Sequence, residues 1–260
     1  MFLKLDILKA YDKVDWRFLC KTLEAFGFSK QWININHQCI STPKISILVN
    51  ETPEGFFNIS RGIRQGDPIS PFLFIIMAEA FGRAIKKMQT DNMIKGVRVT
   101  KEVENTTHQQ FADDTILAGI STLQEANNFK HILDTYTKAS GQMINAEKSE
   151  IYFLNTAEEV DDKICNKLGF KKGKFPFKYL GIYLDKNNYS ILGWDHILKK
   201  FDNQTESWKG RWLTNAGRMT KIKAVLSAIP IYQLSCSQLP KNINSKLERK
   251  LHDFFWNGLE

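Results

Sequence analysis

The stretch Phe111-Ala112-Asp113-Asp114 decides the fold of this 260-residue chain, because it places two adjacent carboxylates between two segments with strand character. The segments are residues 108–111 and 115–118, so the pair is predicted to occupy the tight turn of a β-hairpin. Like charges this close repel, and burying them without a counter-charge is costly. A divalent cation would remove that conflict, and a ligand set made only of oxygen atoms favours magnesium.

Such a dipeptide more often forms a solvated turn than a metal site, because aspartate favours turns. Two features favour a functional site instead. The apolar flanks Phe111, Ile116 and Leu117 are expected to attach the turn to the core. A third carboxylate, Asp6, lies on the polar side of residues 2–7, whose alternation predicts a strand with one buried face.

The rest of the pattern predicts an α+β body followed by a helical appendage. Ser70 as a side-chain cap, followed by Pro71 at the first helical position, is typical of a helix start. The helix that they begin is apolar almost all round, which predicts a place in the middle of a domain. A capping box is predicted at Thr156 and Glu159. Further helices are predicted over 16–26, 29–40 and 122–139, a hairpin over 45–59, strands over 151–154 and 179–184, and three helices over 193–257 with breaks near 214 and 240.

Charge is distributed unevenly along the chain. The formal net charge is +8, and residues 186–260 hold 12 Lys and Arg against 6 Asp and Glu. A basic excess favours polyanionic partners, although composition alone is weak support. The four cysteines are widely scattered, so we expect a reduced intracellular protein without a zinc site, and no apolar run is long enough to suggest a membrane partner.

Three motifs in order resemble those of reverse transcriptases. Residues 5–12 (LDILKAYD) resemble the first catalytic motif, residues 61–71 (RGIRQGDPISP) the second, and residues 111–114 the third. The likeness is greatest to LINE-type (non-LTR) retrotransposon enzymes of plant genomes. The resemblance implies a polymerase palm over 1–185, an antiparallel sheet with packed helices, and a basic helical thumb over 186–260. It implies an RNA-directed DNA polymerase that uses an RNA template, a DNA primer, deoxynucleoside triphosphates and two Mg²⁺ ions, with Mn²⁺ as an alternative.

The family pattern also implies roles for single residues. Asp6, Asp113 and Asp114 would be catalytic metal ligands, with the backbone carbonyl of Ile7 as an additional ligand. Tyr11 would lie under the incoming sugar and exclude a 2′-hydroxyl, and the alternative is ordinary packing of an aromatic side chain beside a strand.

Further roles follow for the loops and the C-terminal region. Lys148 would protonate the pyrophosphate leaving group, and a solvated lysine is the alternative. Contacts with the nucleotide are implied for Arg64, Gln65 and Gly66. Contacts with nucleic acid are implied for Arg61, for Tyr179, Leu180 and Gly181 of a primer-grip-like segment, and for Arg218, Lys221 and Lys223 of a thumb helix. The alternatives are a surface loop before a helix and a solvated basic face. Residues 254–258 (FFWNG) also resemble the family's segment after the thumb.

The chain departs from the family at its beginning. In the family a fingers region that grips the triphosphate precedes the first motif, and with only five residues before Asp6 we expect this region to be absent. We therefore expect an N-terminally truncated domain with little or no polymerase activity alone. A second hypothesis is an inactive retroelement remnant that at most binds nucleic acid. A two-metal nuclease is disfavoured, because a nuclease has no need of a sugar-sensing aromatic such as Tyr11.

Overall fold

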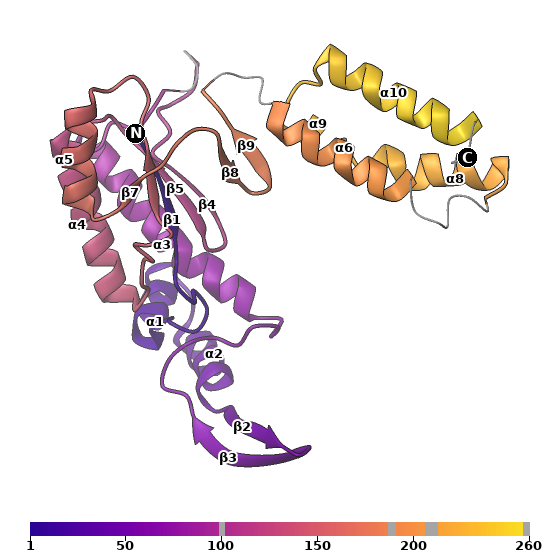
Figure 1. The fold of residues 1–260 in the computed structure, drawn as a ribbon. Helices are drawn as coiled ribbons and strands as arrows, with labels where there is room; N and C mark the ends of the chain where they lie inside the picture. Colours follow the sequence, from indigo (N-terminus) through magenta and orange to yellow (C-terminus); the bar gives the residue numbers. More distant parts are fainter. Residues whose placement is uncertain (99–101, 187–190, 206–212, 257–260) are drawn as a thin grey trace. The chain divides into compact units, whose positions relative to one another are not determined.

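The computed structural model describes residues 1–98, 102–186, 191–205 and 213–256 (Figure 1). The chain forms two compact units, Met1–Gly173 and Lys174–Glu260. The boundary expected between palm and thumb, after residue 185, stays a prediction. Of the segment 254–258, the last two residues lie outside the described ranges.

A five-stranded sheet in the order β4-β5-β1-β6-β7 organises the first unit (Figure 1). All neighbouring strands are antiparallel except the pair β6 and β7. The predicted strand at the N-terminus therefore lies in the centre of the sheet. The strands are β1 (Phe2–Asp6), β4 (His108–Phe111), β5 (Asp114–Ala118), β6 (Glu150–Tyr152) and β7 (Lys171–Lys172).

One face of this sheet is buried under helices. Leu3 and Leu5 of β1 are 0% and 2% exposed, whereas Asp6 lies on the opposite, half-exposed side, as the alternation predicts. The covering helices are α3 (Ser70–Thr90), α4 (Leu123–Ser140) and α5 (Glu158–Leu168). Their apolar side chains join those of β1, β5 and β6 in one core, which holds the central strand rigidly from behind.

A second core lies where α1 (Trp16–Ala25) and α2 (Lys30–Ser41) meet the first half of α3. The hairpin of β2 (Lys44–Val49) and β3 (Thr52–Asn58) extends from this region (Figure 1). Its apolar side chains are largely exposed. The predicted hairpin is confirmed, and it packs little against the rest of the first unit.

The helix α3 is only partly buried, which corrects the expectation of a helix covered on all sides. Phe72 and Ile75 are 67% and 62% exposed, whereas Leu73, Phe74 and Met77 are buried. The reason is that both core clusters contact α3 along the same stripe of residues, and within the described residues nothing packs over the remaining face.

Two predicted helix caps are wrong. Ser70 is the first residue of α3 rather than its cap, because the Asp67 carboxylate accepts a hydrogen bond from the Ile69 amide and turns the chain earlier. Thr156 donates its hydroxyl to the Leu154 carbonyl, and α5 begins after Ala157 without a side-chain cap. By contrast, α4 starts at a Thr122 cap and ends at a left-handed Gly141, as its sequence indicates.

The second unit consists of a small hairpin and a helical bundle. The breaks predicted near Thr214 and Pro240 are confirmed, since Thr214 caps α8 and Pro240 precedes α10. The middle helix is divided into shorter pieces. The elements are β8 (Phe177–Tyr179), β9 (Ile182–Leu184), α6 (Ile191–Thr205), α8 (Asn215–Ala224), the 3₁₀ turn η1 (Leu226–Ala228), α9 (Ile231–Leu234) and α10 (Lys241–Trp256).

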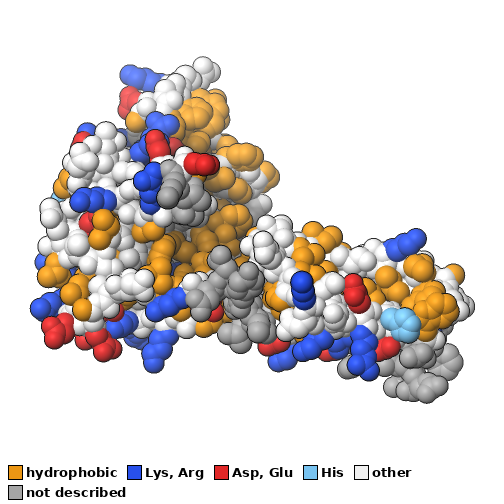
Figure 2. Space-filling model, turned by 90° about the horizontal axis from the view of Figure 1, so that it is seen from above, with side chains coloured by type: hydrophobic (Ala, Val, Ile, Leu, Met, Phe, Trp, Pro, Cys, Tyr) orange, Lys and Arg blue, Asp and Glu red, His pale blue; other side chains and the backbone are white. Residues whose placement is uncertain are grey.

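The helices of the second unit pack around a hydrophobic core that includes Trp194, Phe201 and Leu247. Lys and Arg side chains lie among apolar ones on the face of this unit that Figure 2 shows. Across the described ranges, no helix is both long and apolar enough to cross a bilayer.

Candidate active site

Strand pairing brings the three predicted aspartates to one end of the sheet. Asp6, the last residue of β1, is the register partner of Asp114, the first residue of β5. Asp114 is also paired with Phe111 of β4, so that Ala112 and Asp113 form the two-residue turn between the strands. Ala112 adopts a left-handed conformation with φ of 51°, which a tight hairpin turn requires. The predicted hairpin is confirmed, and its carboxylates adjoin Asp6.

This turn is attached to the core through β5. Ile116 and Leu117 are 8% and 0% exposed, whereas Phe111 is 63% exposed. The expectation that Phe111 anchors the turn is therefore wrong. Because side chains alternate along a strand, β4 at the sheet edge turns Phe111 to the uncovered face.

Burial and the repulsion between like charges both act on the carboxylates of the site. Burial raises the pKa of the Asp114 carboxyl, and the neighbouring carboxylates of Asp113 and Asp6 raise it further, while Lys4 acts in the opposite direction. No salt bridge within the described residues involves any of the three aspartates. The site thus concentrates like charges, which the charge of Lys4 offsets in part.

The three carboxylates do not converge as they stand. Among the described residues, no three His, Cys, Asp or Glu side chains are placed to hold a metal ion. Repulsion between like charges accounts for carboxylates that stay apart. In type and register the residues fit a divalent ion, since oxygen ligands from two adjacent strands adjoin one another and carry like charges.

The loop of residues 141–149 supports Asp6 from its other side. The Asn145 amide donates to the Asp6 carbonyl at 2.8 Å, and the Asp6 amide donates to Ser149 Oγ at 3.1 Å. Ser149 is fully buried, and the preceding Lys148 is exposed. Lys148 therefore directly precedes Ser149, the residue whose hydroxyl accepts the hydrogen bond of the Asp6 amide. Ser149 was not predicted, because nothing in the sequence marks a serine at the start of a strand as a partner of Asp6.

The residue after Asp6 pairs with the same loop. Ile7 forms an isolated antiparallel bridge with Ile144, in which the Leu8 amide donates to the Met143 carbonyl at 2.8 Å. The bridge uses the Asp6 carbonyl and the Leu8 amide. The Ile7 carbonyl, an expected metal ligand, is therefore not required for the pairing.

Tyr11 packs against the side of α3 that carries Phe74. Its ring is stacked on Phe74 of α3, with centroids 4.8 Å apart and planes 9° apart. Its carbonyl accepts a hydrogen bond from the Ile63 amide at 2.9 Å. The ring is half-buried, so packing and a role at the edge of the site are both compatible with its position.

The second motif is docked onto the first through Gly62. Its amide donates to the Val14 carbonyl at 2.8 Å, and its own carbonyl accepts from Trp16 Nε1 at 2.6 Å. At Gly62 φ is +91°, and an added Cβ would lie 2.8 Å from the Asp12 carbonyl oxygen. Only glycine permits this close approach, which explains one glycine of the motif.

The residues of the second motif that were predicted to bind nucleotide or nucleic acid face solvent. Arg61, Gln65 and Gly66 are exposed. Arg64 Nη2 forms a salt bridge with Asp67 Oδ2 at 2.7 Å, which orients the guanidinium along the loop. The loop thus presents polar side chains beside the start of α3, in the region of Tyr11.

The primer-grip-like segment forms a hairpin turn in the second unit. Tyr179 ends β8, and Leu180 and Gly181 form the turn with φ of 47° and 85°. Two successive positive φ values match the twist of a hairpin. The Tyr232 hydroxyl donates to the Leu180 carbonyl at 2.5 Å and ties the turn to α9.

The thumb cations differ in their surroundings. Arg218 Nη1 donates to the Phe255 carbonyl at 3.2 Å, so Arg218 joins α8 to the end of α10. Lys221 Nζ lies 5.6 Å from the centroid of the Phe254 ring. Lys223 is exposed. The three side chains do not form a uniform basic face.

Comparison with known proteins agrees with this architecture. Residues 1–184 match the family model described as reverse transcriptase (RNA-dependent DNA polymerase). The chain is 27% identical over 262 residues to the "Transposon TX1 uncharacterized 149 kDa protein" of Xenopus laevis, covering 99% of this chain and 19% of that protein. It is 24% identical over 214 residues to a Pol polyprotein from the type-1 retrotransposable element R2 of Popillia japonica, covering 75% and 34%. The chain thus spans about a third or less of the length of these relatives.

The fold also has solved counterparts. The structure resembles telomerase from Candida albicans with a TM-score of 0.51 at 10% identity, covering 98% of this chain and 43% of that one. At this identity the likeness concerns the fold alone. Together with the family match over 184 residues, it supports one assignment: the chain belongs to the reverse transcriptase (RNA-dependent DNA polymerase) family.

Proposed function

We propose that this chain is the catalytic core of a non-LTR retroelement reverse transcriptase, which adds deoxynucleotides to a primer 3′-hydroxyl on an RNA template by a two-metal mechanism. Family membership supplies the class of reaction. The observation that carries the assignment to residues is the register of Asp6 opposite Asp114, with Asp113 in the adjoining turn. The plant affiliation rests on the resemblance of the motifs.

Asp6, Asp113 and Asp114 would hold two Mg²⁺ or Mn²⁺ ions. Bound there, the ions would lower the pKa of the primer hydroxyl and neutralise charge on the triphosphate. The chain would position the carboxylates, because β1 and β5 are neighbouring strands whose opposite face is buried in the core. Metal binding would then require only rotation of the aspartate side chains. Such preorganised placement is how a protein accelerates phosphoryl transfer.

Other residues would orient the nucleotide. Tyr11, fixed by its stacking on Phe74, would lie under the sugar and reject a 2′-hydroxyl. Gln65 and Gly66 would contact the nucleotide and the template from the exposed loop, with Arg64 held by Asp67. Lys148, exposed beside the buried Ser149, would donate a proton to the leaving pyrophosphate.

Nucleic acid would be bound by exposed cations and by the hairpin turn of the second unit. Arg61 and Lys223 are exposed and would contact phosphates, which gives salt-dependent and sequence-independent binding. The turn at Leu180 and Gly181 would contact the primer. Arg218 and Lys221 would act through the position of α10 as well as through charge.

The alternative is an inactive remnant that binds nucleic acid without catalysis. The observation in its favour is that the three carboxylates do not converge in the described structure. Both proposals share the fold, and they differ in whether the aspartates support turnover.

Primer extension separates the two proposals. The 260-residue protein is incubated with Mg²⁺ or Mn²⁺, deoxynucleotides and a labelled DNA primer annealed to RNA, and products are resolved on a gel. The polymerase proposal predicts extension that is low in yield but measurable, that Asp113→Asn abolishes and that Asp162→Asn, an exposed change on α5, leaves intact. Binding of the primer–template without extension supports the remnant. A primer shortened in a manner dependent on Asp113 contradicts both and indicates a nuclease.

A further inference from the structure

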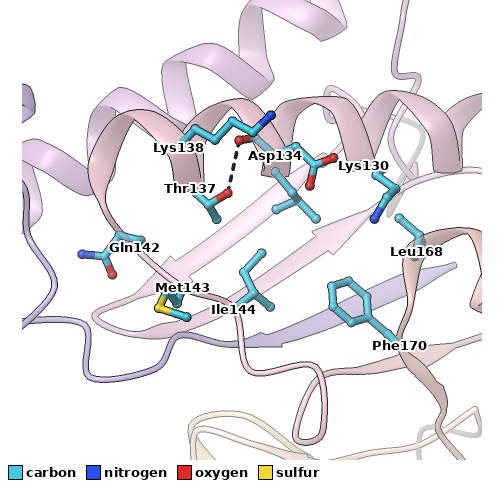
Figure 3. A pocket seen from close by; sticks show the side chains of 10 residues that line it. Lys130, Asp134, Thr137, Lys138, Gln142, Met143, Ile144, Leu168 and Phe170 are labelled. Carbon is cyan, nitrogen blue, oxygen red and sulfur yellow. Dashed lines mark hydrogen bonds between the residues drawn. The ribbon is translucent and has the colours of Figure 1, made fainter.

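The loop between α4 and β6 interrupts the pairing of the central strand. Ile144, which Figure 3 shows on the loop that leaves α4, pairs with Ile7 directly after β1. On the same side of β1, the regular ladder with β6 reaches only as far as the pair of Lys4 with Glu150. Residues 5 and 6 of β1 therefore lie opposite residues 145–149, too long a segment to pair as a regular strand. The segment leaves the sheet and forms a turn.

The turn of residues 145–149 is closed by local hydrogen bonds. The Asn145 carbonyl accepts from the amides of Ser149 at 2.9 Å and Lys148 at 3.3 Å. In addition, Asn145 Oδ1 accepts from the Glu147 amide at 3.1 Å, a local bond that favours a turn. Lys148 is exposed, whereas Ser149 is 0% exposed. The turn thus projects Lys148 into solvent and buries the serine that follows it.

Both main-chain groups of Asp6 are bonded to this turn. The Asp6 carbonyl accepts from the Asn145 amide at 2.8 Å, and the Asp6 amide donates to Ser149 Oγ at 3.1 Å. Because the two groups of a strand residue point to the same side, neither points toward β5, and Asp6 and Asp114 form a non-hydrogen-bonded pair. Side chains lie closer together in such a pair than in a hydrogen-bonded one. The turn therefore holds the backbone of Asp6 and leaves its carboxylate beside that of Asp114.

Ser149 supplies an acceptor that a regular strand would supply from its main chain. In an antiparallel ladder a carbonyl oxygen would accept from the Asp6 amide. Here the chain leaves the sheet, and the serine hydroxyl takes the place of that carbonyl. The hydrogen bond is partly buried, so water would replace a lost hydroxyl poorly and the Asp6 amide would lack a good acceptor.

We propose that Ser149 is a positioning residue for Asp6. Its hydroxyl fixes the main chain of this metal ligand, while the turn that it ends carries Lys148. The inference rests on the proposed function, because it concerns how well Asp6 is prepared for a metal ion. With a fixed backbone, Asp6 reaches the ion by side-chain rotation alone, whereas a mobile backbone has to be ordered when the ion binds. The Ser149 hydroxyl thereby raises the metal affinity without contacting the metal.

Two substitutions of Ser149 separate its hydroxyl from its volume. Ser149→Ala removes the acceptor, and Ser149→Cys fills the space but offers only a weak acceptor. Ser140→Ala is the matched control, because Ser140 is also 0% exposed and its hydroxyl accepts from the Gln142 amide at 3.2 Å. This control removes a buried serine hydroxyl of the same unit that does not bond to Asp6.

The test has two readouts, neither of which requires turnover. Electron paramagnetic resonance of free Mn²⁺ gives the affinity for the metal alone. NMR of protein labelled at the aspartate nitrogens gives the hydrogen-exchange rate of the Asp6 amide, whose resonance is the one missing from Asp6→Asn. We expect Ser149→Ala and Ser149→Cys each to weaken Mn²⁺ binding by about fivefold, less than the loss of the ligand itself. Both should also raise the exchange rate of the Asp6 amide by at least about fivefold, and Ser140→Ala should change neither quantity.

The outcomes distinguish this inference from the proposed function. If Mn²⁺ affinity falls in Asp6→Asn but not in Ser149→Ala, the role of Ser149 is overturned and the metal site stands. Unchanged exchange of the Asp6 amide in Ser149→Ala, full Mn²⁺ affinity in Ser149→Cys, or an equal loss of affinity in Ser140→Ala also overturns that role. Mn²⁺ affinity that Asp6→Asn leaves unchanged overturns the metal site and this inference together.

Discussion

Replacing Gly62 by alanine would force the second motif away from the segment that follows β1. The backbone at Gly62 has φ of +91°, which costs an L-residue about 1–2 kcal/mol. The new Cβ would also lie 2.8 Å from the Asp12 carbonyl oxygen, too close to be tolerated without a shift of the backbone. Such a shift weakens the hydrogen bonds of Gly62 to Val14 and Trp16, each contributing about 1 kcal/mol. The total loss of unfolding free energy should be roughly 3–4 kcal/mol.

Gly27→Ala is the matched control for this substitution. Gly27 has φ of +86° but nothing within 4 Å of an added Cβ, so only the conformational cost of about 1–2 kcal/mol applies. Hydrogen exchange of β1 and α3 peptides reports the stability of the first unit without interference from the second. Equal destabilisation by Gly62→Ala and Gly27→Ala would refute the docking of the two motifs through this contact.

Three further predictions concern separate parts of the chain. Tyr11→Ala should increase ribonucleotide incorporation relative to deoxynucleotide incorporation in primer extension, because the ring fixed by Phe74 would no longer exclude a 2′-hydroxyl; an unchanged ratio contradicts that role. Burial holds the pKa of His108 below its usual 6.5, so its contribution to stability is present above pH 6.5 and is lost as pH falls below that value. His108→Gln should reduce the fall of the unfolding free energy below pH 6.5. The same dependence of the unfolding free energy on pH in the variant and the unaltered protein would contradict this role of His108. Arg218→Ala should lower the protection of α10 against hydrogen exchange by about 1–2 kcal/mol, because the bond to the Phe255 carbonyl is lost. Lys223→Gln should leave that protection intact and should reduce the slope of log K for nucleic-acid binding against log salt concentration by about 1.

The central strand and the aspartate hairpin were predictable because their signals are local. Alternation in β1 follows from one buried face, and an adjacent pair of aspartates between strand-like segments indicates a turn. The end of α4 at the left-handed Gly141 also agrees with a local signal, since glycine favours that backbone conformation. These features depend on residues within a few positions of one another, where backbone preferences decide the outcome.

The features that the sequence does not predict depend on contacts between residues that are far apart in the chain. The contact of Gly62 with Asp12 and the hydrogen bond of Asp6 to Ser149 join segments 50 and 143 residues apart. Ser70 fails as a cap because Asp67 competes for the same turn. The sequence likewise does not predict whether the three carboxylates converge on one point, since this depends on the balance between their mutual repulsion and their attraction to a bound cation.

Binding of Mn²⁺ tests the central claim most directly, because it does not require turnover. Electron paramagnetic resonance of free Mn²⁺ gives the affinity of the 260-residue protein and of its variants. If Asp6, Asp113 and Asp114 share a metal site, Asp6→Asn and Asp113→Asn should each weaken binding by about tenfold or more, which corresponds to about 1.4 kcal/mol. Asp162→Asn should bind as the unaltered protein does. Unchanged Mn²⁺ affinity in both Asp6→Asn and Asp113→Asn would contradict the account.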